Sequence, residues 1–175
     1  MAFHVDYWNY LGWRDPWSSK PFSDRQRAYA HSWKSDSVYT PGFVLNGKEW
    51  RGLSKSIPVA TSKPGVLKMT SDDLKTWNVT FSPAVPVGDS YEVHVAMLTS
   101  DLVSDVKVGE NRGRRLAHDF VVLESRDITL KPESSAFSGS ASFELKSPTG
   151  RNALVVWITK SGQLEPLQAT GGYVN

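Results

Sequence analysis

Cysteine is missing from this sequence of 175 residues. A chain without thiols can form no disulfide, no thiolate nucleophile and no zinc site built on cysteine. Long apolar runs are missing too, so no segment is expected to cross a membrane as a helix. The basic, apolar and small-residue pattern of a signal peptide does not open the chain. These absences exclude thiol chemistry by the chain as given and predict no membrane span.

An excess of one charge is lacking as well. The 20 basic and 18 acidic residues leave a net charge of +2. That balance argues against the strongly basic surface of proteins that bind nucleic acid or membranes. No phosphate-binding loop is present, and Phe137–Ser140 lacks the leading glycine of a nucleophile elbow. We therefore predict no cofactor and no nucleic-acid partner.

The residues that are present predict a packed protein with a β-hairpin near its first third. Thr40 precedes Pro41 and is therefore expected to be extended. Phe43 to Leu45 favour a strand. Asn46-Gly47 is the dipeptide that a two-residue hairpin turn prefers, because both central residues need a positive φ. We predict two short strands joined at this turn.

Upstream of the hairpin, the pattern changes from strand to helix. Ala2–Tyr7 alternates apolar and polar residues and predicts a strand. Ser23 is a candidate N-cap with Gln26 as its capping-box partner, and Arg25–Trp33 is the predicted helix. With the hairpin, this gives the order β-α-β-β. The expected inner side of the helix consists of Ala28, Tyr29 and Trp33.

Beyond a predicted linker at 53–65, short alternating strands separated by turn residues indicate an antiparallel β-sandwich over 66–175. The expected strands are Val66–Met69, Thr76–Ser82, Tyr91–Thr99, Asp105–Val108, Arg115–Ser125, Ala141–Lys146, Ala153–Thr159 and Leu164–Val174. The fold class expected for the whole chain is therefore α+β and mostly β.

Three stretches, AFHVDYWNYLGWRDPW, SKPFSDRQRAYA and VYTPGFVLNGKEWRG, cover Ala2–Gly52, and GENRGRRLAHDFVV covers Gly109–Val122. They resemble a family of bacterial exported thioredoxin-like proteins catalogued as domain of unknown function 1223. The resemblance implies that residues 1–52 form a thioredoxin-like domain lacking its first strand, its Cys-x-x-Cys pair and its first helix. It also implies a periplasmic or secreted protein. If Met1 is the true start, a cytoplasmic protein is expected instead.

A missing central strand would leave a slot between Ala2–Tyr7 and Gly42–Leu45. Unpaired buried backbone is costly, so three outcomes are open. The two strands pair directly, something outside this chain fills the slot, or this part is poorly ordered. An open edge would also allow copies of the chain to associate.

Candidate site residues gather in the same region. His4 and Asp6 lie two apart on the predicted strand, so they could share a metal or form a structural hydrogen-bonded pair. A metal would need further ligands, and we predict none. The resemblance implies that Tyr39, Thr40 and Pro41 would offer backbone to an extended substrate.

Aromatic residues are dense just after the first predicted strand. Trp8 and Trp13 belong to a group that could form a binding platform, or could fill a core and anchor a loop. In Gly109–Arg115, three arginines stand beside two glycines and could grip an anion, but such a run is more often a solvated hairpin turn with Gly113 at positive φ.

Four functions follow as hypotheses. The first is a member of this family without thiol chemistry of its own. The second is a module that binds a protein or an extended peptide in the open slot. The third is a thiol-disulfide oxidoreductase, which requires a Cys-x-x-Cys segment before Met1. The fourth is a metal-assisted enzyme centred on His4 and Asp6.

Overall fold

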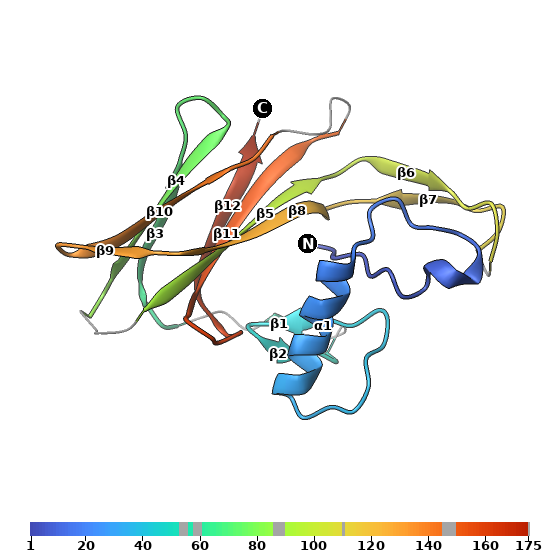
Figure 1. The fold of residues 1–175 in the computed structure, drawn as a ribbon, viewed down its shortest axis with the longest axis horizontal. Helices are drawn as coiled ribbons and strands as arrows, with labels where there is room; N and C mark the ends of the chain where they lie inside the picture. Colours follow the sequence, from blue (N-terminus) through green and yellow to red (C-terminus); the bar gives the residue numbers. More distant parts are fainter. Residues whose placement is uncertain (53–55, 58–60, 86–89, 110, 145–149, 175) are drawn as a thin grey trace.

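Two four-stranded antiparallel sheets make up most of the chain (Figure 1). The computed structural model describes residues 1–52, 56–57, 61–85, 90–109, 111–144 and 150–174. The first sheet has the order β3–β4–β10–β9, formed by β3 (Gly65–Thr70), β4 (Thr76–Pro83), β10 (Ala136–Ser142) and β9 (Lys131–Glu133). The second has the order β12–β11–β5–β8, formed by β12 (Pro166–Val174), β11 (Asn152–Lys160), β5 (Tyr91–Thr99) and β8 (Val121–Thr129). The prediction of a mostly β chain is confirmed.

Side chains from both sheets meet in one hydrophobic core, so the two sheets pack as layers. Val79 and Phe81 of β4 point into this core, as the alternation in the sequence predicts. Val93 and Val95 of β5 face them and are fully buried. The opposite face of β5 is also buried, because Ala96 and its neighbours lie under the N-terminal part of the chain.

Some predicted strand boundaries are wrong. The single strand expected over Arg115–Ser125 is two strands, β7 (Arg115–His118) and β8, separated at Phe120, whose φ is 53°. A strand expected at Asp105–Val108 ends at Asp105 as β6 (Leu102–Asp105). These positions belong to a hairpin, β6 with β7, that continues away from β5 and β8 (Figure 1). The chain enters and leaves this hairpin through single residues with a positive φ. The alternation of apolar and polar residues does not reveal such residues.

The strand expected at Ala141–Lys146 is also misplaced. It is β10, which ends at Ser142, and residues 145–146 lie outside the described part of the chain. The predicted linker at 53–65 is described only at 56–57 and 61–65, and β3 already begins at Gly65.

The helix of the N-terminal region, α1, spans Lys20–Ser32 and starts five residues before its predicted start. Its N-cap is Ser19, and a proline lies in its first turn, where a missing amide costs nothing. The prediction that Ser23 caps the helix is wrong, because Ser23 lies inside it and is 0% exposed. Of the expected inner residues, Tyr29 is buried, Trp33 is half-buried and Ala28 is exposed.

The predicted hairpin is confirmed. Strands β1 (Val44–Leu45) and β2 (Lys48–Glu49) pair across Asn46 and Gly47, whose φ values of 49° and 78° match the turn that this dipeptide prefers. The Thr40–Pro41 peptide bond before the hairpin is cis.

The predicted strand at Ala2–Tyr7 is wrong. Only Ala2 forms a β-bridge, and this parallel bridge pairs it with Val121, the first residue of β8. The Ala2 amide donates to the Phe120 carbonyl at 2.8 Å, and the Val122 amide donates to the Ala2 carbonyl at 2.9 Å. The chain enters against the free edge of the second sheet, because β8 has an unpaired side there. Within the described residues, the first 52 thus contain one α-helix and one two-stranded hairpin, not β-α-β-β.

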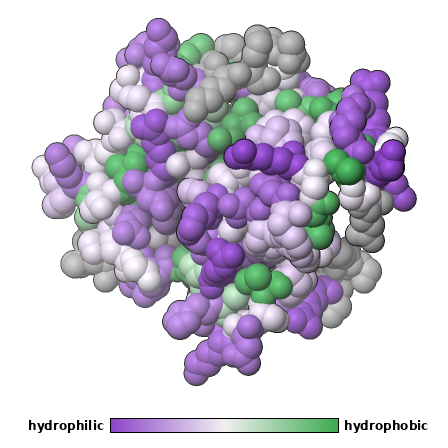
Figure 2. Space-filling model, turned by 45° about the vertical axis from the view of Figure 1, so that its right-hand side comes forward, coloured by the Kyte–Doolittle hydropathy of each residue, from purple (hydrophilic) through white to green (hydrophobic). Residues whose placement is uncertain are grey.

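Residues 1–52, which we call the N-terminal unit, also contain the short 3-10 helix η1 (Asn9–Leu11). Phe22 of α1 joins this unit to the second sheet by packing with Leu98, Val122 and Trp157. No described helix has the length and apolar character needed to cross a membrane. On the face shown in Figure 2, hydrophobic residues form small separate patches among hydrophilic ones.

Candidate binding cavity

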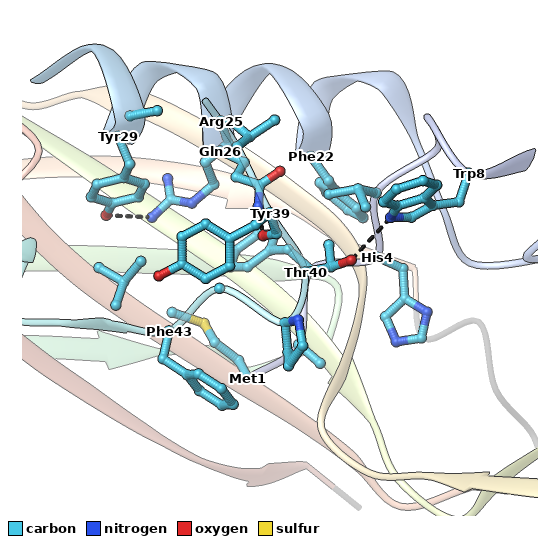
Figure 3. A pocket seen from close by; sticks show the side chains of 18 of the residues that line it. Met1, His4, Trp8, Phe22, Arg25, Gln26, Tyr29, Tyr39, Thr40 and Phe43 are labelled. Carbon is cyan, nitrogen blue, oxygen red and sulfur yellow. Dashed lines mark hydrogen bonds between the residues drawn. The ribbon is translucent and has the colours of Figure 1, made fainter. Parts of the chain in front are cut away.

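A cavity of about 1090 Å³ lies between the N-terminal unit and the second sheet. Its walls come from the segment Ala2–Val5, from α1, from the loop before β1, and from β11 and β12 (Figure 3). Ligand pockets for small molecules commonly measure roughly 300–1,000 Å³, so this space is large for one. Both segments that were predicted to border an empty strand slot line the cavity.

Backbone groups in two of these walls are unpaired. Within the described part of the chain, the amide and carbonyl groups of Phe3 and Val5 have no hydrogen-bond partner. The backbone groups of Thr40 and Gly42, in the loop before β1, also have no partner among the described residues. Both pairs of residues line the cavity. An added extended strand requires free backbone donors and acceptors of this kind.

Side chains hold the loop of residues 39–42 in place. The Trp8 indole donates to the Thr40 hydroxyl at 3.0 Å, and the Gln26 side chain donates to the Tyr39 carbonyl at 2.7 Å. The Tyr39 hydroxyl donates to Glu49 at 2.6 Å, and this hydrogen bond raises the pKa of Tyr39. Trp8 remains 46% exposed and Tyr39 41% exposed, so both rings are accessible. Figure 3 shows Trp8, Thr40 and Tyr39 around the same cavity.

The predicted pair of His4 and Asp6 does not form. His4 Nδ1 lies 2.6 Å from Asp15, whereas Asp6 accepts a hydrogen bond from the Ser23 hydroxyl at 2.5 Å. The Asp6 amide donates to the same hydroxyl at 3.0 Å. His4 and Asp6 therefore bind different partners, because the chain between them does not alternate as a strand would. No group of three or more residues able to hold a metal is found among the described residues.

His4 instead belongs to a cluster at the end of the cavity. Its ring lies 5.5 Å from the His118 ring on β7, and Trp17 packs against both. His118 Nε2 lies 2.8 Å from the Ser104 hydroxyl on β6. Burial lowers the pKa of His118, and the charge of His4 lowers it further. Burial also raises the pKa of Asp15, but hydrogen bonds from His4 and the Trp17 amide outweigh it, so the net pKa is lowered.

The cavity brings together all the sequence-predicted residues except Asp6, which is not among the residues that line it. Trp13 and Pro41 line it with His4, Trp8, Tyr39 and Thr40. Sequence reasoning missed Arg25 and Gln26 on α1, and Trp157 on β11. Helical spacing offered a signal, since Phe22, Arg25, Gln26 and Tyr29 recur at intervals of three and four. Within the motif at 109–115, of which residue 110 lies outside the described residues, positions 111–113 form an exposed turn with Gly113 at φ 79°, as expected. Gly109 and Asn111 line the cavity.

Fold and cavity define a protein with two packed antiparallel sheets and a helix-and-hairpin unit that encloses a cavity against one of them. The chain belongs to the family described as protein of unknown function DUF1223, whose profile matches residues 1–159. No curated protein matches the chain.

A solved structure shares the fold. The chain resembles a crystal structure of a protein from Agrobacterium tumefaciens, a structural genomics target, with a TM-score of 0.64 and 21% sequence identity. The similarity covers 99% of this chain and 78% of that one. A candidate beta-galactosidase of Bacteroides fragilis matches with a TM-score of 0.33 and 14% identity, over 64% of this chain and 16% of that one, which is too low to inform the fold.

Proposed function

We propose that this protein binds an extended segment of a peptide or protein in the cavity between its N-terminal unit and its second sheet. The observation that carries the proposal is that two separate segments lining the cavity have free backbone groups, at Phe3 and Val5 and at Thr40 and Gly42. A peptide strand laid between them would supply partners for these groups. Main-chain hydrogen bonds would provide affinity, and alternate side chains would contact the exposed rings of Trp8 and Tyr39.

The proposal includes a non-enzymatic role for the chain as given. With no cysteine, it has no thiol nucleophile, so a thioredoxin-like origin of the N-terminal unit would leave a scaffold for binding and not for thiol exchange. We further propose, from the family resemblance, that the protein acts in the periplasm or is secreted. Insulin reduction above background by the purified chain would contradict the non-enzymatic role.

The binding proposal is tested with pools of fluorescein-labelled hexapeptides and fluorescence anisotropy. We expect at least one pool to bind, and we expect Val5→Pro to weaken binding tenfold or more, because proline removes the amide donor at position 5. The Val5 amide has no partner among the described residues, so Val5→Pro removes no backbone hydrogen bond of the free protein. Val5→Ala is the matched control and should bind as the wild type does.

A second pair of variants tests the aromatic contacts. Tyr39→Ala removes a ring that lines the cavity, whereas Tyr173→Ala removes a ring on β12 that is 53% exposed and lies outside it. Binding should fall for the first and stay unchanged for the second. Equal effects of the two variants, or no binding by any pool, would overturn the proposal. A dimer seen by light scattering and abolished by Val5→Pro would show instead that a second copy occupies the slot.

A further inference from the structure

We propose that the cavity selects ligands that carry a carboxylate, with Arg25 as the group that binds it. This inference deepens the proposed function, because it names the chemistry of the peptide that the cavity would hold. Arg25 lies in the second turn of α1, and its half-buried side chain faces the cavity (Figure 3). Whether Arg25 can bind an anion depends on how its guanidinium is held and on which of its hydrogen-bond donors are already used.

Three aromatic rings surround the guanidinium. Its central carbon lies 4.9 Å from the centroid of Phe3, 5.1 Å from that of Tyr29 and 5.0 Å from that of Trp157. The three rings come from the N-terminal segment, α1 and β11, so the guanidinium is held by three separate parts of the fold. Cation–π contacts of this kind attract a cation to the ring faces and keep it in place without neutralising it. Arg25 is therefore positioned but still charged.

Most of its hydrogen-bonding capacity is unused. A guanidinium carries five N–H donors, and one nitrogen of Arg25 donates to the Tyr29 hydroxyl at 3.1 Å. Among the described residues, no carboxylate lies within ion-pair distance of Arg25. The charge of Arg25 does lower the pKa of Asp127, but less than the hydrogen bond from His94, whose Nδ1 lies 2.7 Å from that carboxylate. Asp127 is thus hydrogen-bonded to His94 and is not an ion-pair partner of Arg25.

The other charged side chains in the cavity wall have partners of their own. Asp15 is bound to His4, and Glu49 is bound to Arg51 at 2.9 Å and to the Tyr39 hydroxyl. Among the described side chains that line the wall, Arg25 is the cation without a counter-ion. Met1 lines the wall too, and burial lowers the pKa of its α-amino group. A planar guanidinium with two free N–H groups matches a carboxylate in bidentate geometry. The ligand class is thus a peptide that places its C-terminal carboxylate, or the carboxylate of an Asp or Glu side chain, beside Phe3 and Trp157.

Two small probes test the anion separately from the peptide strand. N-acetyl-Ala-Ala is titrated as the free acid and as the amide, followed by the NMR shifts of the Arg25 Nε–H and the Trp157 indole. We expect the acid to bind at least tenfold more tightly than the amide, and we expect 0.5 M NaCl to reduce this preference. Equal affinity of acid and amide for the wild type would overturn the inference, and this measurement requires no variant to fold.

Variants locate the binding group. Arg25→Gln should abolish the preference for the acid, and Arg25→Lys should keep part of it, because lysine retains the charge but not the fork. Arg27→Gln is the matched control, since Arg27 is exposed on the same helix and pairs with Asp24 outside the cavity. A preference that survives Arg25→Gln, with α1 intact by circular dichroism, would overturn the assignment of Arg25.

The two proposals can fail independently. Hexapeptide pools that bind regardless of charge and of Arg25 would leave the peptide-binding function standing and overturn the carboxylate inference. Binding of the small acid through Arg25, with no hexapeptide bound and no effect of Val5→Pro, would support the anion site and overturn the strand slot.

Discussion

Strand β5 is hydrogen-bonded on both sides, to β8 and β11, and its side chains are buried on both faces. The segment Ala2–Val5 of the N-terminal unit has one β-bridge, and Phe3 and Val5 leave their backbone groups unpaired. Both regions are built from short apolar stretches, yet β5 has hydrogen-bonded neighbours on both sides, whereas Ala2–Val5 keeps unpaired backbone groups. The sandwich therefore serves stability, whereas the N-terminal unit keeps the groups that a ligand could use.

The sandwich and the N-terminal unit also differ in the contacts that hold each of them in place. The core between the sheets is formed within the sandwich itself. The N-terminal unit buries few residues, and Phe22 packs mainly against side chains of the second sheet. Its position thus depends on contacts with the sandwich, namely Phe22, the bridge at Ala2 and the cluster of His4 with His118. Four predictions test whether the two regions are as unequal as this comparison suggests.

The largest effect is expected in the core of the sandwich. Phe81 is 1% exposed and packs against Tyr91 with ring centroids 5.1 Å apart. Phe81→Ala should lower the free energy of unfolding by about 3–5 kcal/mol, because it removes a buried ring and leaves a cavity. Urea denaturation followed by far-UV circular dichroism measures this. A loss below about 1 kcal/mol would contradict the assignment of the core.

The second prediction concerns the joint between the regions. Phe22→Ala should loosen the N-terminal unit, with a local cost of about 2–4 kcal/mol, while the sandwich keeps its own core. Hydrogen exchange should rise in residues 20–32 and stay low in β5 and β11. Uniformly faster exchange along the whole chain would show that the two regions unfold as one.

A smaller loss of folding stability is expected from a substitution inside the N-terminal unit. Ser23→Ala removes the hydroxyl that binds both the amide and the carboxylate of Asp6. The unpaired groups should cost about 1–2 kcal/mol, measured by the same urea titration. Ser32→Ala is the control, since its hydroxyl only bonds back to Tyr29 in its own helix. A Ser23→Ala loss no larger than that control would show that the Asp6 contact is dispensable.

The smallest effect is a dependence on pH. The pKa of His118 is lowered on folding, so its neutral form is favoured in the folded protein. The contribution of His118 to the stability of the fold is present above pH 6.5, its ordinary pKa. It is lost as the pH falls through the lower pKa of the folded protein. Asp15, with its pKa also lowered, loses its contribution below pH 3.8 as pH falls further.

This pH dependence can be separated from that of other histidines. Hydrogen exchange at residues 2–6 should rise between pH 7 and pH 5, and His118→Gln should remove this step. His31→Gln, on the exposed side of α1, should leave it unchanged. A step that persists in His118→Gln would assign the titration to another group.

Local sequence patterns predicted many of the elements and fewer of the contacts in the candidate site. Asn46-Gly47 predicted its turn correctly because the turn requires a positive φ at both central residues, and these two residue types adopt it readily. Alternation located β4, β5 and β11, since each has a core face. It failed at Ala2–Tyr7, where alternation is not followed by pairing. Trp8, Trp13 and Tyr39 line one cavity, but Arg25 in the same wall was missed because two of the rings around it, Phe3 and Trp157, come from distant parts of the chain.

The sequence by itself determined the absence of thiols, the hairpin turn, the central helix residues and the alternating strands, because these depend on residue type and on near neighbours. Only the tertiary structure decided that Ala2 meets Val121, that His4 turns to Asp15 and His118, and that Arg25 lies against Phe3 and Trp157. Each of those contacts joins residues whose separation along the chain carries no local signal. Their partners are chosen by which sheet edge and which face remain free once the two sheets have packed.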